Sequence, residues 1–305
     1  MNTVLEVYDL TKTYKGFHAN DHISLRIPKG SIFGLVGPNG SGKSTLMKIV
    51  GGLAYPSGGS IKLFEQDPKQ DSMVYRRIGT LIENAGFYPS MNAYDNMKLK
   101  SLAMGCFQEN RNKELLKVCD IHTTGKKKVK HFSLGMKQRL GIAMALLGEP
   151  EFLILDEPTN GLDPQGISDI RTLLLKLNKE RGMTILISSH ILEELGKIAT
   201  HYAFIKQGKL LECITKEELQ EKSKDFCCLK VNDTQRASVI LEEICGITSY
   251  EVLPQQCIHI YKSYEYPQQI AKALIQQDVE LYEMSVHKQS LEEYFLKESG
   301  DQHVE

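Results

Sequence analysis

The 305-residue sequence lacks a long apolar segment, a secretion signal and an excess of charge of either sign. No apolar run approaches the roughly 18 residues that a membrane-spanning helix requires. The residues Met1–Val7 show no charged segment followed by an apolar one, so we expect no secretion signal. With 37 basic and 38 acidic residues the formal net charge is −1, which argues against a dedicated nucleic-acid-binding protein.

Cysteine occurs without a pattern that indicates disulfides. The seven cysteines are an odd number and have no C-x-x-C spacing, which indicates reduced thiols in a cytosol. The adjacent residues Cys227 and Cys228 allow a redox pair, but we favour two buried or half-buried strand residues. Hydrophobic residues make up 41% of the chain, and its length allows one large domain and a small one.

A phosphate-binding loop is the first motif with a chemical meaning. The segment Gly37–Thr45 fits the pattern G-x-x-x-x-G-K-[ST], after the apolar run Ser31–Val36 and before the run Leu46–Val50. The glycines let successive backbone N–H groups point at an anion, and the following helix adds the positive end of its dipole. The residues predicted to surround the phosphates are Gly37, Pro38, Asn39, Gly40, Ser41, Gly42, Lys43, Ser44 and Thr45.

Two of these side chains carry specific roles in such a loop. Lys43 supplies a positive charge for the terminal phosphates, and the Ser44 hydroxyl can ligate Mg²⁺. We therefore predict nucleotide binding. A glycine-rich turn that fits the pattern by accident is the alternative, and the strand and helix that flank the loop disfavour it.

Two further apolar runs end in polar residues. Phe152–Leu155 continues into Asp156 and Glu157, and Thr184–Ser189 continues into His190. Continuous apolar runs are typical of buried parallel strands, and ligands of such sheets bind at the carboxyl ends of the strands. We expect Asp156 to hold Mg²⁺, Glu157 to act as general base on the attacking water, and His190 to contact the γ-phosphate. Two solvated acids and a packing or capping histidine are the alternatives.

Together these motifs resemble those of the ATP-binding subunit of an ABC transporter. The resemblance extends from about Leu5 to Leu219, and the motifs occur in the family's order. Gly37–Thr45 resembles Walker A, Phe152–Glu157 resembles Walker B with its catalytic glutamate, and Gly161–Asp163 resembles the D-loop.

The resemblance also implies roles for residues outside the phosphate loop. His190 corresponds to the switch histidine, and Tyr14 to an aromatic residue that stacks on adenine, with an ordinary strand tyrosine as the alternative. Ser133 and Gly135 fall in the signature motif, which in the family contacts the ATP held by the opposite subunit, and Asp163 belongs to the nucleotide site through the D-loop.

The sequence departs from the family pattern in two places. Where the family has Leu-Ser-Gly-Gly-Gln, this chain has Phe132–Met136, with Leu134 for the first glycine and Met136 for the glutamine. Glu83 replaces a metal-linked glutamine, and its carboxylate can still ligate Mg²⁺ while adding negative charge. These features resemble the ATPases of bacitracin-resistance and lantibiotic-immunity exporters.

The resemblance implies an α/β fold, that of a P-loop NTPase (ABC ATPase) core with an antiparallel β lobe and a helical subdomain. We expect the cassette to span 1–220, with strands of the lobe in Val4–Ile27 and Ser60–Phe64. The helical subdomain is expected at about 84–148, with helices over Asn92–Met104 and Asn112–Cys119.

After a charged linker, residues 225–305 are predicted to form a small accessory or regulatory domain. The pattern is βαββαβ followed by a helix, as in ferredoxin-like α+β domains. Structural support is the role that we favour, and sensing is the alternative. The predicted strands are Phe226–Val231, Glu251–Leu253, Cys257–Tyr261 and Glu280–Val286, and the predicted helices are Thr234–Ile244, Gln268–Gln276 and Ser290–Lys297.

We therefore expect an ATPase that uses ATP and Mg²⁺, forms a head-to-tail dimer with a second copy, and powers export of a peptide antibiotic. The membrane permease would be a separate subunit that contacts Gly86–Met91, where local packing of an ordinary turn is the alternative, and the ATPase would lie at the cytoplasmic face of the membrane. An ABC ATPase acting on ribosomes or nucleic acid is disfavoured by the single Walker A motif and the absence of a coiled-coil insertion. A regulatory module without hydrolysis is disfavoured by Glu157.

Overall fold

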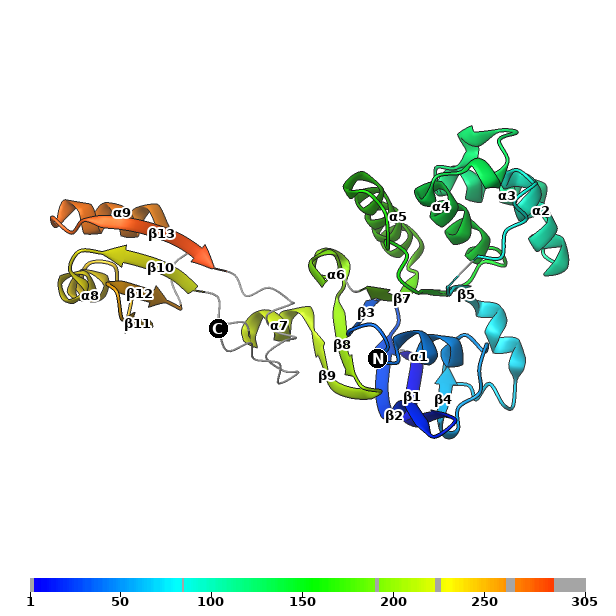
Figure 1. Cartoon of the computed structure of the whole chain (residues 1–305), viewed down its shortest axis with the longest axis horizontal. Helices are drawn as coiled ribbons and strands as arrows, with labels where there is room; N and C mark the ends of the chain where they lie inside the picture. The colour runs from blue at the N-terminus through cyan, green and yellow to red at the C-terminus, as the bar shows by residue number, and fades with distance from the viewer. Residues whose placement is uncertain (1–2, 84, 190–191, 223–225, 262–266, 288–305) are drawn as a thin grey trace. The chain divides into compact units, whose positions relative to one another are not determined.

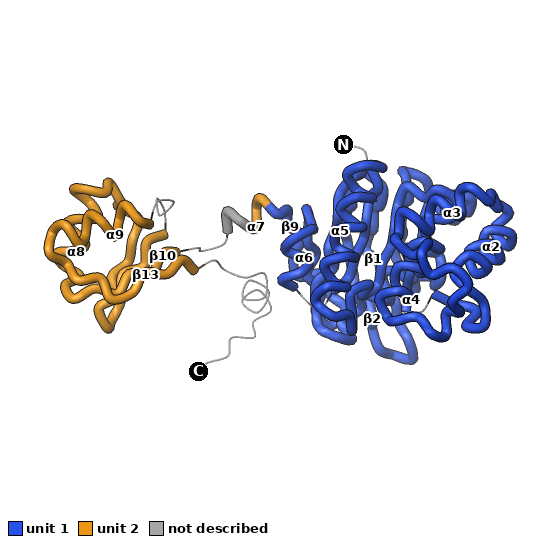
Figure 2. The backbone as a smooth tube through the Cα atoms, turned by 90° about the horizontal axis from the view of Figure 1, so that it is seen from above, with its two compact units in different colours: residues 1–216 blue, residues 217–305 orange. Residues whose placement is uncertain are grey.

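The computed structural model of the chain describes residues 3–83, 85–189, 192–222, 226–261 and 267–287. These residues belong to two compact units, 1–216 and 217–305, which Figure 2 colours blue and orange. His190 and the predicted helix Ser290–Lys297 lie outside the described residues. Among the described residues, every helix is too short or too polar to serve as a membrane span.

The main sheet of the first unit has six strands, in the order β5 (Ile78–Leu81), β6 (Phe152–Leu155), β7 (Thr184–Ser189), β3 (Ile32–Val36), β8 (His201–Lys206) and β9 (Lys209–Thr215). The first five are parallel, and β9 pairs antiparallel with β8 at the edge (Figure 1). Every residue of β3, β6 and β7 is buried, as their continuous apolar sequences predict. The carboxyl ends of these strands therefore meet at one edge of the sheet.

A three-stranded antiparallel sheet confirms the predicted β lobe. Its order is β2 (Phe17–Pro28), β1 (Thr3–Tyr14) and β4 (Gly58–Leu63). Helix α1 (Lys43–Val50) contributes four apolar side chains to a buried cluster that also contains residues of both sheets. Because the helix that follows the phosphate loop is packed against both sheets, the loop is fixed at the end that enters α1, whereas Pro38, Asn39 and Gly40 are exposed.

The remaining helices of the first unit fall into two groups. Helices α5 (Pro164–Arg181) and α6 (Leu192–Ile198) pack on the main sheet, whereas α2 (Ala93–Ala103), α3 (Glu109–Val118) and α4 (Leu134–Ala145) form the helical part. Short 3-10 helices lie at Ser72–Arg77, His122–Thr124 and Val129–His131.

The helical part agrees with the prediction apart from one boundary. Helix α3 begins at Glu109 rather than at Asn112. In its first turn the Glu109 carboxylate lies 2.6 Å from the Lys113 ammonium, four residues later, a spacing at which opposite charges stabilise a helix. The apolar pattern alone does not reveal that turn because its side chains are polar.

The second unit has the predicted βαββαβ order. After α7 (Lys216–Lys222), its elements are β10 (Phe226–Val231), α8 (Thr234–Glu243), β11 (Tyr250–Leu253), β12 (Cys257–Ile260), α9 (Pro267–Gln276) and β13 (Leu281–His287). The antiparallel sheet has the order β11-β12-β10-β13, which is that of a ferredoxin-like domain. Its core is a separate cluster of apolar side chains from β10, β12, α8 and α9.

Candidate active site

The phosphate loop is enclosed by neighbouring backbone. Gly40 and Gly42 have φ angles of +78° and +106°, in the region that favours glycine. A Cβ atom on Gly42 would lie 2.2 Å from the Ala19 carbonyl oxygen, and one on Gly37 would lie 2.1 Å from that of Ile205. A larger residue at Gly37 would push the loop away from β8, and one at Gly42 would push it away from β2.

Two contacts hold the loop from outside its own sequence. The buried Asn20 side chain donates from Nδ2 to the Gly42 carbonyl oxygen over 3.1 Å, and the Gly208 amide donates to the Ser41 carbonyl oxygen over 2.9 Å. Asn20 did not stand out in the sequence, where its signal is a polar residue at a buried strand position. Gly208 lies in the β8–β9 turn, far from the loop along the chain.

Lys43 places a positive charge inside the loop. Its side chain is 5% exposed, and Nζ donates to the carbonyl oxygens of Gly37 and Pro38 over 2.8 and 3.0 Å. Burial lowers the pKa of Lys43, while the carboxylates of Glu157 and Asp156 act in the opposite direction. A buried ammonium is stabilised by an anion, so this environment favours binding of a phosphate.

Other features of the loop also fit a phosphate. The Ser41 hydroxyl is buried and has no hydrogen-bond partner among the described residues. An unpaired buried hydroxyl is costly, and a phosphate oxygen would satisfy it. Ser44 and Thr45 are half-buried in the first turn of α1, where the helix dipole favours an anion.

The strand that ends in two acids lies two strands from the loop strand. Asp156 and Glu157 follow β6, and β7 separates β6 from β3. Ser188 on β7 joins the two acidic residues: its hydroxyl donates to Asp156 Oδ1 over 2.6 Å and accepts from the Glu157 amide over 2.9 Å. Glu157 has φ +47°, an unusual value for a side chain of this size, so Ser188 stabilises a strained backbone beside the acids. Sequence reasoning did not identify Ser188, because the contact joins neighbouring strands.

The predicted signature and D-loop residues lie together at a cavity that the phosphate loop does not line. Ser133 is the N-cap of α4 and Asp163 is the N-cap of α5, where their oxygens accept from the amides of Met136 and Gly166 over 3.2 and 3.0 Å. Ser133, Gly135 and Asp163 line one cavity of about 540 Å³, and the phosphate-loop residues do not. Two helix N-termini face this cavity, and both favour an anion.

Two other predicted residues are on the surface. Tyr14 at the end of β1 is 46% exposed, and the Lys12 ammonium lies 4.7 Å from its ring centroid. Glu83 is also exposed, and its Oε1 lies 2.5 Å from Nζ of Lys48 on α1. This ion pair joins the segment after β5 to the helix that follows the phosphate loop. The Asp156 carboxylate and the Ser44 hydroxyl are oxygen ligands of the kind that Mg²⁺ takes.

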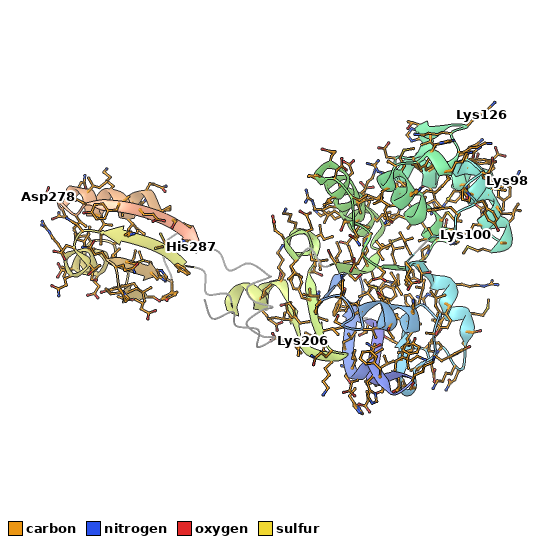
Figure 3. The ribbon with its side chains drawn as sticks, viewed as in Figure 1. Lys98, Lys100, Lys126, Lys206, Asp278 and His287 are labelled. Atoms are coloured by element: carbon orange, nitrogen blue, oxygen red, sulfur yellow. The ribbon has the colours of Figure 1, made fainter. Side chains whose placement is uncertain are left out.

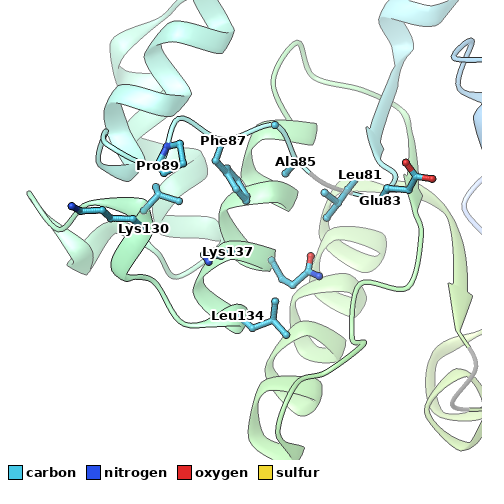
Figure 4. Close-up of a pocket in the computed structure, with 11 residues that line it drawn as sticks. Leu81, Glu83, Ala85, Phe87, Pro89, Lys130, Leu134 and Lys137 are labelled. Carbon is cyan, nitrogen blue, oxygen red and sulfur yellow. The ribbon is translucent and has the colours of Figure 1, made fainter.

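The segment predicted to meet a membrane partner lies between two cavities. One, of about 300 Å³, is lined by Phe87, Pro89, Leu134 and Lys137 among others (Figure 4). Tyr88 lines the other, of about 390 Å³, and Gly86 lines both. In Figure 4 the Glu83 carboxylate points away from Phe87. Leu134 also lines the cavity that contains Ser133, so its side chain forms a wall common to both.

The comparisons with known proteins agree with this geometry. A family model described as ABC transporter matches residues 20–160. The bacitracin transport ATP-binding protein BcrA of Bacillus licheniformis is 38% identical over 301 residues, 98% of each chain. The lantibiotic transport ATP-binding protein SrtF of Streptococcus pyogenes is 43% identical over 208 residues, 68% of this chain and 89% of its own. A solved dimer of the ATP-binding cassette MJ0796, bound to ADP and Pi, has a TM-score of 0.63 and 27% identity, and covers 70% of this chain and 98% of its own.

The parallel sheet, the glycine loop with its buried lysine and the adjacent acids define a P-loop ATPase. The chain belongs to the ABC transporter family and is an ATP-binding subunit of that family, which couples ATP hydrolysis to transport.

The Ser188 hydroxyl gives a first testable prediction. Replacing Ser188 with Ala removes the hydrogen bonds to Asp156 and Glu157, and we expect kcat for ATP hydrolysis to fall about 10–100-fold, as for other groups that orient a catalytic side chain. KM for ATP should change little because the phosphate loop is untouched. Ser31→Ala, a buried serine before β3 whose hydroxyl donates to the Pro28 carbonyl oxygen, is the matched control. Equal kcat values for the two variants would contradict the positioning role.

Proposed function

We propose that this ATPase powers the export of a peptide antibiotic of the bacitracin or lantibiotic type through a separate membrane permease. The observation that carries the proposal is the match to BcrA, which spans both units of the chain. The match to SrtF covers 68% of the chain and therefore cannot include both units in full. The bacitracin type is accordingly the better-supported substrate.

In this proposal one half of the site binds the nucleotide through its own subunit. The phosphate loop and Lys43 hold the β- and γ-phosphates, while Tyr14 stacks on the adenine. Asp156 and Ser44, with Glu83 as a further candidate, would hold Mg²⁺, which neutralises charge on the phosphates when bound.

The chemical step requires a base and a charge sensor beside the γ-phosphate. Glu157 is assigned the role of the base that accepts a proton from the attacking water, because it directly follows Asp156 at the carboxyl end of β6. Its backbone amide is held by Ser188 over 2.9 Å, which fixes the start of the side chain. His190 is assigned to the γ-phosphate, from its place directly after β7.

The other half of the site acts on a second copy of the chain. Ser133, Gly135 and Asp163 line a cavity at two helix N-termini that the phosphate loop does not share. We assign this surface to the ATP held by the partner in a head-to-tail homodimer. The dimeric state of the MJ0796 cassette supports this arrangement.

The permease contact is assigned to Gly86–Met91 and the cavities beside it. Phe87 is half-buried and Tyr88 exposed there, so an apolar partner segment could bury both. Such a contact would hold the ATPase at the cytoplasmic face of the membrane.

Removing the catalytic base should separate binding from hydrolysis. In Glu157→Gln the side chain keeps its shape but cannot accept the proton, so we expect hydrolysis to slow about 100-fold or more. The variant should bind ATP and accumulate as a dimer, measured by light scattering with saturating Mg-ATP. Glu180→Gln, an exposed substitution on α5, should behave as the unaltered protein. A Glu157→Gln protein that remains monomeric with Mg-ATP would refute the composite site.

The role of Glu83 is tested by its Mg²⁺ dependence. Glu83→Gln should remain active but require a different Mg²⁺ concentration for half-maximal ATPase rate, since a ligand charge is lost. Lys48→Met, which breaks the ion pair and leaves the carboxylate, is the matched control. Superimposable Mg²⁺ titrations of Glu83→Gln and the unaltered protein would show that Glu83 acts as the Lys48 partner alone.

The transport proposal is tested in cells. Co-expression with its membrane permease subunit should raise survival in bacitracin, and Glu157→Gln should abolish that gain because hydrolysis drives export. Survival in a lantibiotic is measured in the same cells for comparison. Sensitivity unchanged for both compounds, with the complex assembled in the membrane, would contradict the proposed substrate class.

A further inference from the structure

One face of the sheet in the second unit has cysteine and histidine side chains that take no part in ATP hydrolysis. Cys227, Leu229, Ile258 and Ile260 point to the core beneath α8 and α9. Side chains alternate along a strand, so Cys228 and His259 belong to the opposite face. They are direct cross-strand partners on β10 and β12, and Cys257 lies two residues from His259 on the same face.

These three side chains converge. One ligand atom from each of Cys228, Cys257 and His259 lies within 4.8 Å of the others, and the two sulfur atoms are 3.1 Å apart. All three residues are half-buried. Two sulfurs and one imidazole at this spacing come from two hydrogen-bonded strands, so their positions are fixed by the sheet rather than by a loop.

Aromatic contacts orient the imidazole. The Phe226 ring stacks on His259 with centroids 3.9 Å apart and on His287 with centroids 4.9 Å apart. Figure 3 labels His287 at the end of β13. Because the His259 ring is stacked on Phe226, little rotational freedom is lost when it binds a ligand.

We propose that Cys228, Cys257 and His259 form a binding site for one thiophilic metal ion, with Zn²⁺ as the ion that best fits the ligands. Zinc takes thiolate sulfur and imidazole nitrogen in tetrahedral geometry. Zn–S bonds of about 2.3 Å place two sulfurs about 3.8 Å apart, so Cys228 and Cys257 need to separate by less than about 1 Å. Three protein ligands leave the fourth position for water or another small ligand.

Two thiols can also balance the charge of a divalent ion when both lose their protons. Zn²⁺ binding displaces one proton from each thiol to solvent, and the two thiolates neutralise the ion. No oxidant or reductant takes part.

The test uses full-length protein, kept reduced and freed of metal. We expect one equivalent of Zn²⁺ to bind with high affinity, as measured by competition with a chromophoric chelator. Cys228→Ser, Cys257→Ser and His259→Ala should each weaken that affinity by roughly 100-fold or more, beyond the 10–100-fold typical of groups that only support a ligand. Cys245→Ala, in the same unit but outside the cluster, should bind as the unaltered protein.

Two further measurements separate ligation from loss of fold. Co²⁺ added in place of Zn²⁺ should give thiolate-to-metal charge-transfer absorption that disappears in Cys228→Ser and persists in Cys245→Ala, while circular dichroism of both variants is unchanged. Calorimetry in buffers of different ionisation enthalpy should show about two protons released per Zn²⁺. The proposal would be overturned if no Zn²⁺ binds with high affinity, or if the Cys228→Ser, Cys257→Ser double variant binds it as tightly. A Cys228–Cys257 disulfide found in protein alkylated at lysis would also overturn it.

Discussion

The first unit depends on one buried positive charge. The Lys43 ammonium is enclosed by its own loop, and its pKa is lowered because few water molecules can solvate it. Burying a lysine without a partner is costly, so the fold must supply carbonyl oxygens and nearby carboxylates, or bind an anion. The close backbone approaches at Gly37 and Gly42, the Asn20 contact and the carboxyl-end placement of Asp156 and Glu157 all surround this charge.

The same sheet explains why the two proposed half-sites for phosphate lie at separate places. The phosphate loop and the acids follow strands of the main sheet, whereas Ser133 and Asp163 begin helices that face another cavity. Leu134, which replaces a glycine of the family pattern, lines both that cavity and the one beside Phe87.

Most elements of the fold could be predicted because their signals are local. Apolar runs predicted the buried strands, and the motif at Gly37–Thr45 predicted the order of strand, loop and helix that the structure has. Asn20 and Ser188 could not be found in this way, because each acts on a residue brought near by strand pairing. The Glu83–Lys48 ion pair was missed for the same reason, and family resemblance pointed to a metal ligand there. The Cys228–Cys257 contact likewise depends on the register of β10 and β12, which hydrophobic alternation alone did not fix.

The central claim is that a working site contains the phosphate loop of one copy and the signature surface of another. Lys43→Ala removes the first contribution and Ser133→Glu places a negative charge on the second, so each variant alone should be nearly inactive. In a mixed dimer, the intact Lys43 of one copy faces the intact Ser133 of the other. We therefore expect the ATPase rate of the mixture to rise clearly above that of either variant. If both variants are folded and mixed dimers form, but the mixture hydrolyses no more ATP than the separate variants, the composite site is contradicted.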